Sequence, residues 1–520
     1  MIHGVEIRFL APGACSIELL SDRSYREDED FEIYLNGTCM GSYRKHVLSF
    51  FDLESGASYQ GEVHTAQGAV HRFSFTVPCP TYVLDVRDFG ALGDGQAHDG
   101  AAINMALYCA QPGSVVYIPK GRYRVDSILL RSAVSIYLAA GAELIQDCER
   151  RNLARIQAHP LSYDGQQRDY NSSWEGNPLD CYGSLIYGRE VEDVAIYGPG
   201  VLNGSGQEAA WWEQPKEAKE GAFRPRNVQL VRCKRIALVG LTSRNSAAWN
   251  IHPLYSDDLD FIDLQIQSRI PSPNTDGIDP ESCQQLRILG CHFAVGDDCI
   301  AIKSGKIYMA EWAGRPTRGV TVRNCYMEGG HAGVAIGSES AGGVSGVQVQ
   351  NCLFEGTDRG LRIKTRRGRG WRSVMEDIDF SNCVMDAVQH AFVCNMYYFC
   401  DPDGHSPEVR AKEGYSLGQG TPSVRTIRVA NLEARNIRGT ALFAYGLAEN
   451  PIQKIRLEDS RFHFASERAT EPAAMMDDFD FSGPYNRGIY IQHVRSLEVE
   501  NCSFEGHYYH TEGGRTHEHQ

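Results

Sequence analysis

Three carboxylates that could act together lie within one short segment, residues 271–305. Asp276 ends the triplet Asn-Thr-Asp, and the adjacent pair Asp297 and Asp298 follows about one structural repeat later in Gly-Asp-Asp. The alternating run at residues 286–288, between the two motifs, predicts a short strand. We therefore expect the three side chains at the ends of neighbouring strands, where they could share one site.

Acids in this arrangement suit the hydrolysis of a glycosidic bond. That reaction needs one carboxylic acid to protonate the leaving oxygen and one carboxylate to take a proton from water. Three carboxyl groups in one cleft also differ in pKa, because like charges oppose one another's ionisation, so one can stay protonated while the others act as bases. The alternative is that Asn-Thr-Asp and Asp-Asp are ordinary turn residues that bond their own backbone.

Two later motifs favour the catalytic interpretation. His331 follows in Gly-Gly-His-Ala-Gly, and Arg362 and Lys364 flank Ile363 in a strand-like run. Successive side chains of a strand alternate between its faces, so Arg362 and Lys364 should point to one face while Ile363 points into the core. Two cations fixed beside acids suit the binding of a substrate carboxylate, which arginine can hold with two hydrogen bonds.

The four motifs resemble those of glycoside hydrolase family 28, the polygalacturonases. They are Asn-Thr-Asp at 274–276, Gly-Asp-Asp at 296–298, Gly-His at 330–331 and Arg-Ile-Lys at 362–364, and the resemblance covers roughly residues 81–510. It implies hydrolysis with inversion, which would place acid and base about 6.5–9.5 Å apart with a water between them. It also implies a reaction without a metal or any other cofactor.

The resemblance further implies roles for individual residues. Asp297 would be the general acid, Asp276 with Asp298 would activate water, and His331 would lie beside the acid and tune its protonation. The motifs leave the order of Asp297 and Asp298 open. The residues expected to bind substrate are Asn274, Lys303, Arg362, Lys364, Arg366 and Arg367.

Three of these binding residues rest on separate observations. Lys303 follows the next predicted strand after the acids and should point to the same face as Arg362 and Lys364, although a solvated surface charge is the alternative. Arg366 and Arg367 are included because residues 365–370 resemble the corresponding segment of bacterial exo-acting members.

Composition narrows the class of partner. The 520 residues carry 51 Lys and Arg against 66 Asp and Glu, a net charge of −15. This balance argues against nucleic acid or an anionic membrane as a partner. It would also oppose an anionic polysaccharide, but basic residues gather within fourteen positions: Arg359, Arg362, Lys364, Arg366, Arg367, Arg369 and Arg372. The sequence therefore predicts a local cationic region in an acidic protein.

The N-terminus and the cysteines bear on the compartment. The chain opens without a basic segment followed by an apolar run, and no stretch approaches the ~20 apolar residues of a membrane span. These features predict a cytoplasmic protein, or a secreted one if a leader has been removed. Many of the 16 cysteines occupy one position of a repeated strand pattern. This favours small buried side chains with reduced thiols over a disulfide framework.

Two domains are expected. Residues 1–80 contain five or more short alternating runs separated by turn residues, which predict a small β-sandwich. The run at 53–59 resembles the tyrosine corner of a fibronectin type III domain. We expect a structural role for this domain, as a spacer or as a wall of the cleft. A proline-rich linker at 78–80 would join it to a catalytic domain at 81–520.

Residues 81–520 are predicted to form an all-β domain, a right-handed parallel β-helix. Residues 86–121 resemble the opening cap of pectin-active β-helices, and such a cap covers the apolar end of the first coil. Beyond it, a short strand pattern with Gly or Asn before a cysteine recurs around Cys291, Cys325, Cys352, Cys383 and Cys502. The irregular intervals between these cysteines are typical of a β-helix, in which strands stack in register and loops vary in length.

Long insertions between 148 and 187, 394 and 424, and 465 and 488 are expected to build walls around the binding face. Closed walls would favour attack from a chain end. The insertions carry aromatic residues that could stack on sugar rings or anchor the loops: Trp174 and Tyr182 in the first, and Tyr397, Tyr398 and Tyr415 in the second.

The leading hypothesis is an exo-acting polygalacturonase that hydrolyses α-1,4 bonds of galacturonan or its oligomers from the non-reducing end. Another pectic glycan, rhamnogalacturonan or xylogalacturonan, is an alternative substrate. A calcium-dependent β-helical pectate lyase and a non-catalytic glycan-binding β-helix are alternative functions, since a fold does not determine an activity. The oligomeric state stays open.

Overall fold

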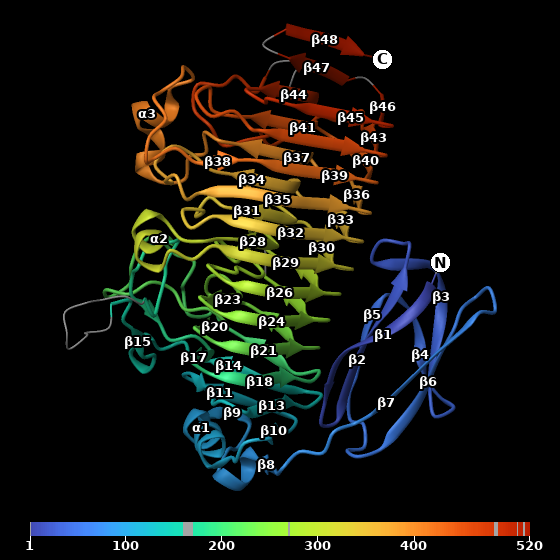
Figure 1. Cartoon of the computed structure of the whole chain (residues 1–520). Coiled ribbons are helices and arrows are strands. Elements are labelled where there is room, and N and C mark those ends of the chain that lie inside the picture. The colour runs from blue at the N-terminus through green and yellow to red at the C-terminus, as the bar shows by residue number, and fades with distance from the viewer. Residues whose placement is uncertain are drawn as a thin grey trace.

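The computed structural model describes residues 2–159, 170–268, 271–482, 487–506, 508–512 and 515–519. Its elements are almost all strands, arranged as a long parallel β-helix with an antiparallel sandwich beside it (Figure 1). The predicted fold class is therefore confirmed. Within the described ranges, no helix is long and apolar enough to cross a membrane.

The N-terminal sandwich consists of two antiparallel sheets. One has the order β1-β2-β5 and the other β4-β3-β6-β7. The strands are β1 (Ile2–Ala11), β2 (Ala14–Ser21), β3 (Arg26–Leu35), β4 (Thr38–Lys45), β5 (Val47–Phe50), β6 (Ser58–His64) and β7 (Val70–Thr76). The hydroxyl of Tyr59 accepts a hydrogen bond of 3.1 Å from the backbone N–H of Glu54, which is the contact that defines a tyrosine corner.

A cap opens the β-helix. It comprises β8 (Val83–Asp85), the 3₁₀ helix η1 (Val86–Phe89), β9 (Asp94–His98) and α1 (Gly100–Cys109). Helix α1 buries Ile103, Ala106 and Leu107 in the core that the coils share. It thereby covers apolar side chains that the first coil would otherwise expose at its end, as a solenoid requires.

Two long parallel sheets form two faces of the β-helix. The 14-stranded sheet contains β8, β10 (Ser114–Ile118), β13 (Val134–Leu138), β18 (Glu192–Tyr197), β21 (Lys234–Val239), β24 (Asp257–Ile262), β26 (Gln284–Leu289), β29 (Thr317–Arg323), β32 (Val344–Gln350), β35 (Val374–Ser381), β38 (Ser423–Val424), β39 (Thr426–Ala430), β42 (Lys454–Glu458) and β45 (Leu497–Glu500). The 13-stranded sheet contains β9, β11 (Gly121–Val125), β14 (Ala142–Gln146), β19 (Val201–Asn203), β22 (Thr242–Arg244), β25 (Gln265–Gln267), β27 (His292–Ala294), β30 (Tyr326–Glu328), β33 (Leu353–Glu355), β36 (Val384–Asp386), β40 (Glu433–Ile437), β43 (Arg461–Phe464) and β46 (Ser503–Glu505).

The third face is built from two shorter sheets. The first contains β12 (Ile128–Leu129), β17 (Ile186–Arg189), β20 (Val228–Val231) and β23 (Ile251–Leu254). The second contains β28 (Ile300–Ile302), β31 (Val334–Ile336), β34 (Arg359–Lys364), β37 (His390–Asn395), β41 (Thr440–Tyr445), β44 (Gly488–Gln492), β47 (Tyr508–Glu512) and β48 (Arg515–His519). Parallel bridges through Ile278 and Glu281 link β23 to β28, so the face is continuous.

The insertions project from the side of the β-helix that carries this third face. They include η2 (Arg150–Asn152), the hairpin β15 (Arg155–Ile156) with β16 (Cys181–Tyr182), α2 (Ile307–Ala313), η3 (Pro402–His405) and α3 (Pro407–Arg410). In Figure 1, α2, α3 and β15 lie on one side of the β-helix, and the sandwich lies on the other. The insertions, and not the sandwich, therefore surround the third face.

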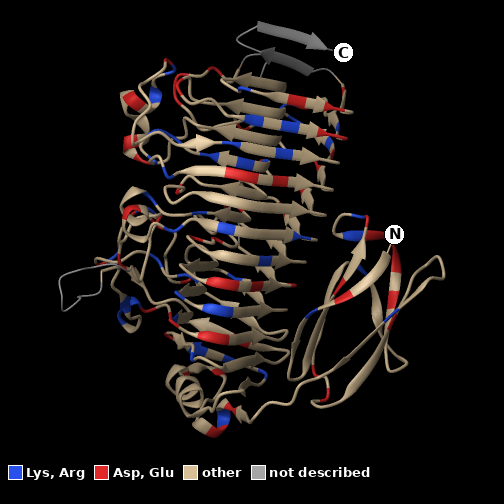
Figure 2. Ribbon diagram, in the orientation of Figure 1, with Lys and Arg blue, Asp and Glu red and all other residues tan. Residues whose placement is uncertain are grey.

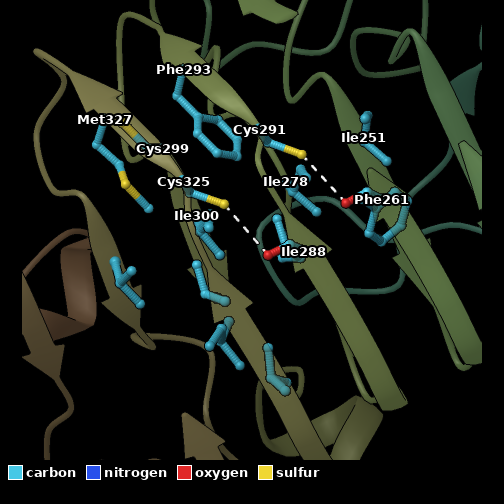
Figure 3. Close-up of a cluster of buried hydrophobic side chains, with 14 of the residues drawn as sticks. Ile251, Phe261, Ile278, Ile288, Cys291, Phe293, Cys299, Ile300, Cys325 and Met327 are labelled. Atoms are coloured by element: carbon cyan, nitrogen blue, oxygen red, sulfur yellow. Dashed lines mark hydrogen bonds between the residues drawn. The ribbon is translucent and has the colours of Figure 1, made fainter. Parts of the chain in front are cut away.

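The recurring Asn-Cys pair has a physical basis in the turn between the two long sheets. Asn324, Asn351, Asn382 and Asn501 all have φ between +50° and +54°, a left-handed conformation that asparagine tolerates. Gly290 takes the same conformation, with φ of +65°, before Cys291. Cys291 and Cys325 point into the core (Figure 3), where the thiol of Cys291 donates to Phe261 O at 3.4 Å and that of Cys325 to Ile288 O at 3.4 Å. All sixteen cysteines are free thiols, as predicted.

The outer surface of the 14-stranded sheet carries charges that pair between neighbouring coils. Figure 2 shows acidic and basic positions distributed along these strands. Examples are Arg287 with Asp260 at 2.5 Å and Arg235 with Asp193 at 2.6 Å. Both arginines are partly exposed, and such surface pairs contribute about 0–1 kcal/mol each. The stability of the stack therefore rests on its apolar interior.

The sandwich packs on the turns that follow the 14-stranded sheet. Glu18 is fully buried there and accepts hydrogen bonds from Arg323 at 2.7 Å and Asn324 at 2.8 Å. A Cβ added to Gly290 would lie 2.2 Å from Val47, and one added to Gly240 would lie 2.2 Å from Phe51, so both turns need glycine. The sandwich thus attaches to the β-helix at a distance from the third face.

Candidate active site

The three predicted acids converge on the third face. Asp276 lies two residues before the bridging residue Ile278, and Asp297 and Asp298 lie directly before β28. One carboxylate oxygen of each lies within 4.8 Å of the others. Adjacent coils stack about 4.8 Å apart, which brings Asp276 of one coil close to Asp297 and Asp298 of the next.

A cavity opens over this cluster, and we call it the acidic cavity. It is lined by Glu175, Lys216, Trp249, Asn274, Asp276, Asp297, Asp298, Lys303, Ser338, Glu339, Lys364, Tyr398 and Cys400. No residue of the sandwich contributes to this lining, so the structure does not give that domain the role of a wall. Six of the predicted site residues line the cavity: Asn274, Asp276, Asp297, Asp298, Lys303 and Lys364.

Asp298 is held as a carboxylate by two cations from β34. Its Oδ2 accepts a hydrogen bond of 2.7 Å from Lys364 Nζ, and its Oδ1 lies 3.5 Å from Arg362 Nη1. Burial alone would raise the pKa of Asp298, but the charges of Lys364 and Arg362 outweigh burial and hold that pKa well below its usual range. Asp298 is therefore ionised at any pH near neutral.

Asp276 has the opposite electrostatic environment. Burial raises its pKa well above the usual value, and the negative charges of Asp279 and Asp297 add to that effect. Asp279, which the sequence analysis did not select, is buried beside it, and burial raises its pKa to about 7 despite the nearby Lys303. The acidic cavity therefore combines a permanent carboxylate with carboxyl groups that hold protons more strongly.

Lys303 balances the second group of acids. Its Nζ lies 3.0 Å from Asp279 Oδ1, 3.7 Å from Glu339 Oε2 and 3.8 Å from Asp276 Oδ2. The same ammonium lies 4.8 Å from the centre of the Trp249 ring, a cation–π contact. Lys303 is thus a buried partner of acids, and the alternative of a solvated surface charge is wrong.

His331 lies beside the cluster but does not line the cavity. Its backbone N–H donates to Asp297 O at 3.1 Å, and its Nδ1 lies 2.8 Å from Asp358 Oδ2. The hydrogen bond to Asp358, with further help from Asp297 and Asp298, raises the pKa of His331. A histidine in this position favours a positive charge next to Asp297.

The buried Arg224 holds the Asn-Thr-Asp turn by hydrogen bonds. Its guanidinium donates to Asn274 Oδ1 at 2.6 Å, to Pro273 O at 2.8 Å and to Ala247 O at 2.8 Å. Asn274 has φ of +56°, so this turn is left-handed at its first residue. The side-chain oxygen of Asn274 therefore accepts from Arg224, and Asn274 lines the acidic cavity together with Asp276.

Arg362 is available to a ligand in a way that Arg366 and Arg367 are not. Its Nη2 donates to the weak acceptor Met475 Sδ at 3.3 Å, and its guanidinium stacks 5.4 Å from the Tyr398 ring. Arg366 instead bonds Asp401 and Asp403 within the second insertion, and Arg367 makes a bidentate pair with Glu449. All three arginines are buried and lie outside the cavity lining, so what distinguishes Arg362 is its contact with Asp298 and its weak second acceptor.

The aromatic residues of the insertions divide between anchors and lining. Trp174 is buried, stacks on Trp249 and Phe223, and has the guanidinium of Arg224 over its ring. Tyr182 and Tyr397 are buried away from the lining, whereas Tyr398 lines the cavity and Tyr415 is 46% exposed. Loop anchoring is therefore the better account of most of them.

Several lining residues were not found from the sequence. Ser338 and Glu339 follow β31. In the register of the third face, Ile302, Ile336 and Ile363 are aligned in successive coils. Gly337 therefore occupies the position that Lys303 and Lys364 take in their own coils. Lys216 comes from an insertion at 204–227 that the repeat pattern did not reveal. An alignment of successive rungs could have pointed to the region after Ile336, but not to Lys216.

The three-acid cluster could in principle hold a divalent cation, since its oxygens are close enough. The charges around it oppose that use. Lys364 donates to Asp298 Oδ2, Arg362 lies 3.5 Å from its Oδ1, and Lys303 lies against Asp276 and Asp279. A calcium ion at the cluster would be repelled by the positive charges of Lys303, Arg362 and Lys364. These charges favour acid–base chemistry by the three carboxyl groups.

A parallel β-helix that gathers three carboxylates and their cationic partners in a cavity surrounded by insertions suits a glycoside hydrolase. The family model of glycosyl hydrolases family 28 matches residues 152–412, about half of the chain, and the protein belongs to this family. A second model, rhamnogalacturonase A/epimerase, pectate lyase-like, matches residues 83–143, which contain the cap.

Individual relatives agree with this assignment. The chain is 29% identical over 408 residues to a probable polygalacturonase of Vitis vinifera, which covers 77% of this chain and 78% of the relative. An exopolygalacturonase structure from Thermotoga maritima has a TM-score of 0.65 at 26% identity and covers 81% of this chain and 91% of its own. A family 28 exopolygalacturonase structure from Yersinia enterocolitica shares the fold over 96% of this chain and 99% of its own, with a TM-score of 0.66 at 17% identity.

Proposed function

We propose that this glycoside hydrolase is an exo-acting polygalacturonase that cleaves α-1,4-galacturonosyl bonds of homogalacturonan or its oligomers with inversion. The observation that carries the proposal is the convergence of Asp276, Asp297 and Asp298 in one cavity, with Lys364 on its lining and Arg362 behind it, 3.5 Å from Asp298. The relatives reported above are polygalacturonases by name, which supports a pectic galacturonan as the substrate.

In the proposed mechanism, each acid has a role that fits its surroundings. Asp297 lines the cavity, is more exposed than the other two, and donates the proton to the leaving oxygen. Asp276 and Asp298 together orient and deprotonate the water; in each, the Oδ1 atom accepts no hydrogen bond from the described residues. His331, bonded to Asp358, keeps positive charge near Asp297.

The charge around Arg362 supports recognition of a galacturonate. Its guanidinium stacks on Tyr398 and lies 3.5 Å from Asp298, and its Nη2 donates to the weak acceptor Met475 Sδ, so this side of the guanidinium can bind a sugar carboxylate at the cleavage point. A neutral sugar offers no carboxylate to these donors.

The insertions support attack at a chain end. Lys306 N donates to Gly176 O in the first insertion at 2.8 Å, and Lys306 Nζ lies 2.8 Å from Asp401 Oδ2 in the second. Glu175 pairs with Lys216 on the same wall, and a Cβ on Gly176 would lie 2.7 Å from Glu339. The two insertions therefore meet through Lys306 and close one side of the acidic cavity, which suits a substrate that enters by its end.

A time course of polygalacturonate digestion tests the proposal. We expect short products to accumulate from the first minutes with little loss of viscosity, because the closed wall admits only chain ends. The first products should carry the β-anomer at the new reducing end, seen by proton NMR, because inversion of an α bond gives β. Rapid viscosity loss with mid-sized oligomers would contradict exo action. Activity on rhamnogalacturonan or xylogalacturonan alone would contradict the substrate.

The proton affinity of Asp276 leads to a prediction for the pH profile. As a base, Asp276 must lose its proton, so its raised pKa sets the acidic limb of kcat/KM against pH. Asp279→Asn removes a neighbouring negative charge and lets Lys303 turn to Asp276, so the pKa of Asp276 falls. The acidic limb should then move to lower pH.

The matched control is Asp260→Asn, which removes a carboxylate from the outer surface of the 14-stranded sheet. Its pH profile should follow that of the unmodified enzyme. An acidic limb that stays in place or moves to higher pH in Asp279→Asn would show that Asp276 is not the titrating base.

A further inference from the structure

Trp371 is an exposed aromatic residue on a well-ordered turn outside the acidic cavity. Its side chain is 60% exposed. The turn is nevertheless fixed, since Gly368 N and Gly370 N both donate to Gly420 O and Trp371 N donates to Gln419 O at 2.8 Å. A large exposed ring on a hydrogen-bonded backbone can stack on a ligand without first being ordered.

A depression of about 390 Å³ lies beside this ring. Its lining includes Pro316, Arg318, Trp371, Arg372, Glu376 and Arg425. Arg318 and Glu376 flank Ser345 in register across β29, β32 and β35, so the floor of the depression is formed by the N-terminal ends of three neighbouring strands of the 14-stranded sheet. Ligand sites in proteins are commonly of this size, and a floor of paired strands needs little rearrangement to bind.

The charge of this depression is positive. The Arg372 guanidinium lies 5.1 Å from the centre of the Trp371 ring. Arg425 pairs with Glu376 at 2.6 Å, whereas Arg318 and Arg372 have no carboxylate at ion-pair distance among the residues that the structure describes. A second depression shares Trp371 and Arg372 and contains Glu311 and Arg369. Arg369 donates to Ser338 O at 2.8 Å and lies 3.7 Å from Asp401, so it is already engaged, and Glu311 makes this depression less suited to an anion.

We propose that the depression formed by Trp371, Arg372 and Arg318 is an accessory binding site for acidic sugar residues of a polysaccharide. The indole ring would stack on the face of a sugar, and the two guanidinium groups would bind its carboxylate. The site rests on the proposed function, because galacturonan supplies the uronate residues. A chain held there has a higher effective concentration at the acidic cavity, while the bond-breaking step is unaffected.

The test compares a polymer with a dimer, using the double variant Trp371→Ala/Arg372→Ala in the full-length protein. On polygalacturonate, KM should rise about tenfold with kcat unchanged. On digalacturonate, both constants should match those of the unmodified enzyme, because a dimer cannot reach both sites. In an Asp297→Asn background, which leaves the polymer intact, affinity electrophoresis in polygalacturonate should show binding about tenfold weaker.

A second exposed aromatic–arginine pair provides the control. Tyr108 is 76% exposed with Arg131 5.8 Å from its ring centre, but Arg131 Nη1 donates to the carbonyl of Ala110 at 2.9 Å and is not free. Tyr108→Ala/Arg131→Ala should leave polymer KM unchanged.

Equal polymer KM in the Trp371→Ala/Arg372→Ala variant and the control variant would overturn the proposal, and so would equally strong retention by neutral galactan. The proposed function fails separately if the unmodified enzyme cleaves no galacturonan. The electrophoresis then still decides the accessory site, because it needs no hydrolysis.

Discussion

An Asp297→Asn enzyme is expected to lose about 10²–10⁴-fold in kcat on polygalacturonate, the usual contribution of a positioned general acid. Asparagine keeps the Oδ1 that accepts from Asp298 N at 3.0 Å, and Asp297 has no ion pair among the described residues, so the fold should not change. Steady-state kinetics together with a thermal melt would show both results. Near-normal kcat in a folded variant would refute the acid assignment.

The same variant can establish which of the two adjacent acids donates the proton. A substrate with an acidic leaving group, such as a nitrophenyl galacturonide, needs little protonation as the bond breaks. If Asp297 is the acid, Asp297→Asn should lose much less activity on this substrate than on polygalacturonate. Asp298→Asn should lose activity equally on both, because the need for an activated water is the same. The reverse pattern would exchange the two roles.

A Lys364→Met enzyme is expected to lose about 3–5 kcal/mol of unfolding free energy, the usual cost of removing one partner from a buried ion pair. Lys364 and Asp298 are both buried, and without Lys364 the Asp298 carboxylate keeps only Arg362 at 3.5 Å. The lowered pKa of Asp298 stabilises the fold above the unfolded value of about 3.9, and this contribution is lost as pH falls further. The destabilisation should therefore be complete at neutral pH.

Urea denaturation at neutral pH measures this loss. The double variant Lys364→Met/Asp298→Asn should recover part of the stability, because the buried Asp298 charge is removed while Arg362 loses its carboxylate partner, but none of the activity. Lys454→Met provides a control, since its pair with Glu498 is exposed and should contribute about 0–1 kcal/mol. A single variant as stable as the control would mean that Lys364 does not hold Asp298 in its charged form.

The acids and the cations of β34 could be found from the sequence because, in a β-helix, their spacing along the chain determines their relative positions. Arg362 and Lys364 are two residues apart on one strand, and Asp276 and Asp298 occupy equivalent places in successive coils, so both relations are local. The Asn-Cys pairs indicated the coil in the same way, since the left-handed turn and the inward thiol depend only on adjacent residues.

Contacts between distant segments were beyond that reasoning. Arg366 and Arg367 were included on a resemblance of residues 365–370 alone. Their partners, Asp403 and Glu449, lie 37 and 82 residues away in loops with no periodic pattern, so the sequence did not reveal these pairs. Lys216 and Trp249 also line the acidic cavity. Lys216 comes from the insertion at 204–227, and Trp249 stacks on Trp174 of another insertion, so neither position follows from the repeat pattern. The compact acid cluster also depends on the stacking distance between coils, which the sequence does not express.

The attachment of the sandwich has a consequence for how the β-helix comes apart. Residues of the sandwich contact successive turns from Tyr137, which bonds Asp52, to Asn382, whose carbonyl accepts from Ser24. In a solenoid, each coil otherwise depends on its two neighbours alone. Unfolding that begins at the C-terminal end should therefore stop at the coils that the sandwich contacts. Asp276, Asp297 and Asp298 lie within this stretch. The catalytic centre should thus stay folded after the terminal coils have unfolded.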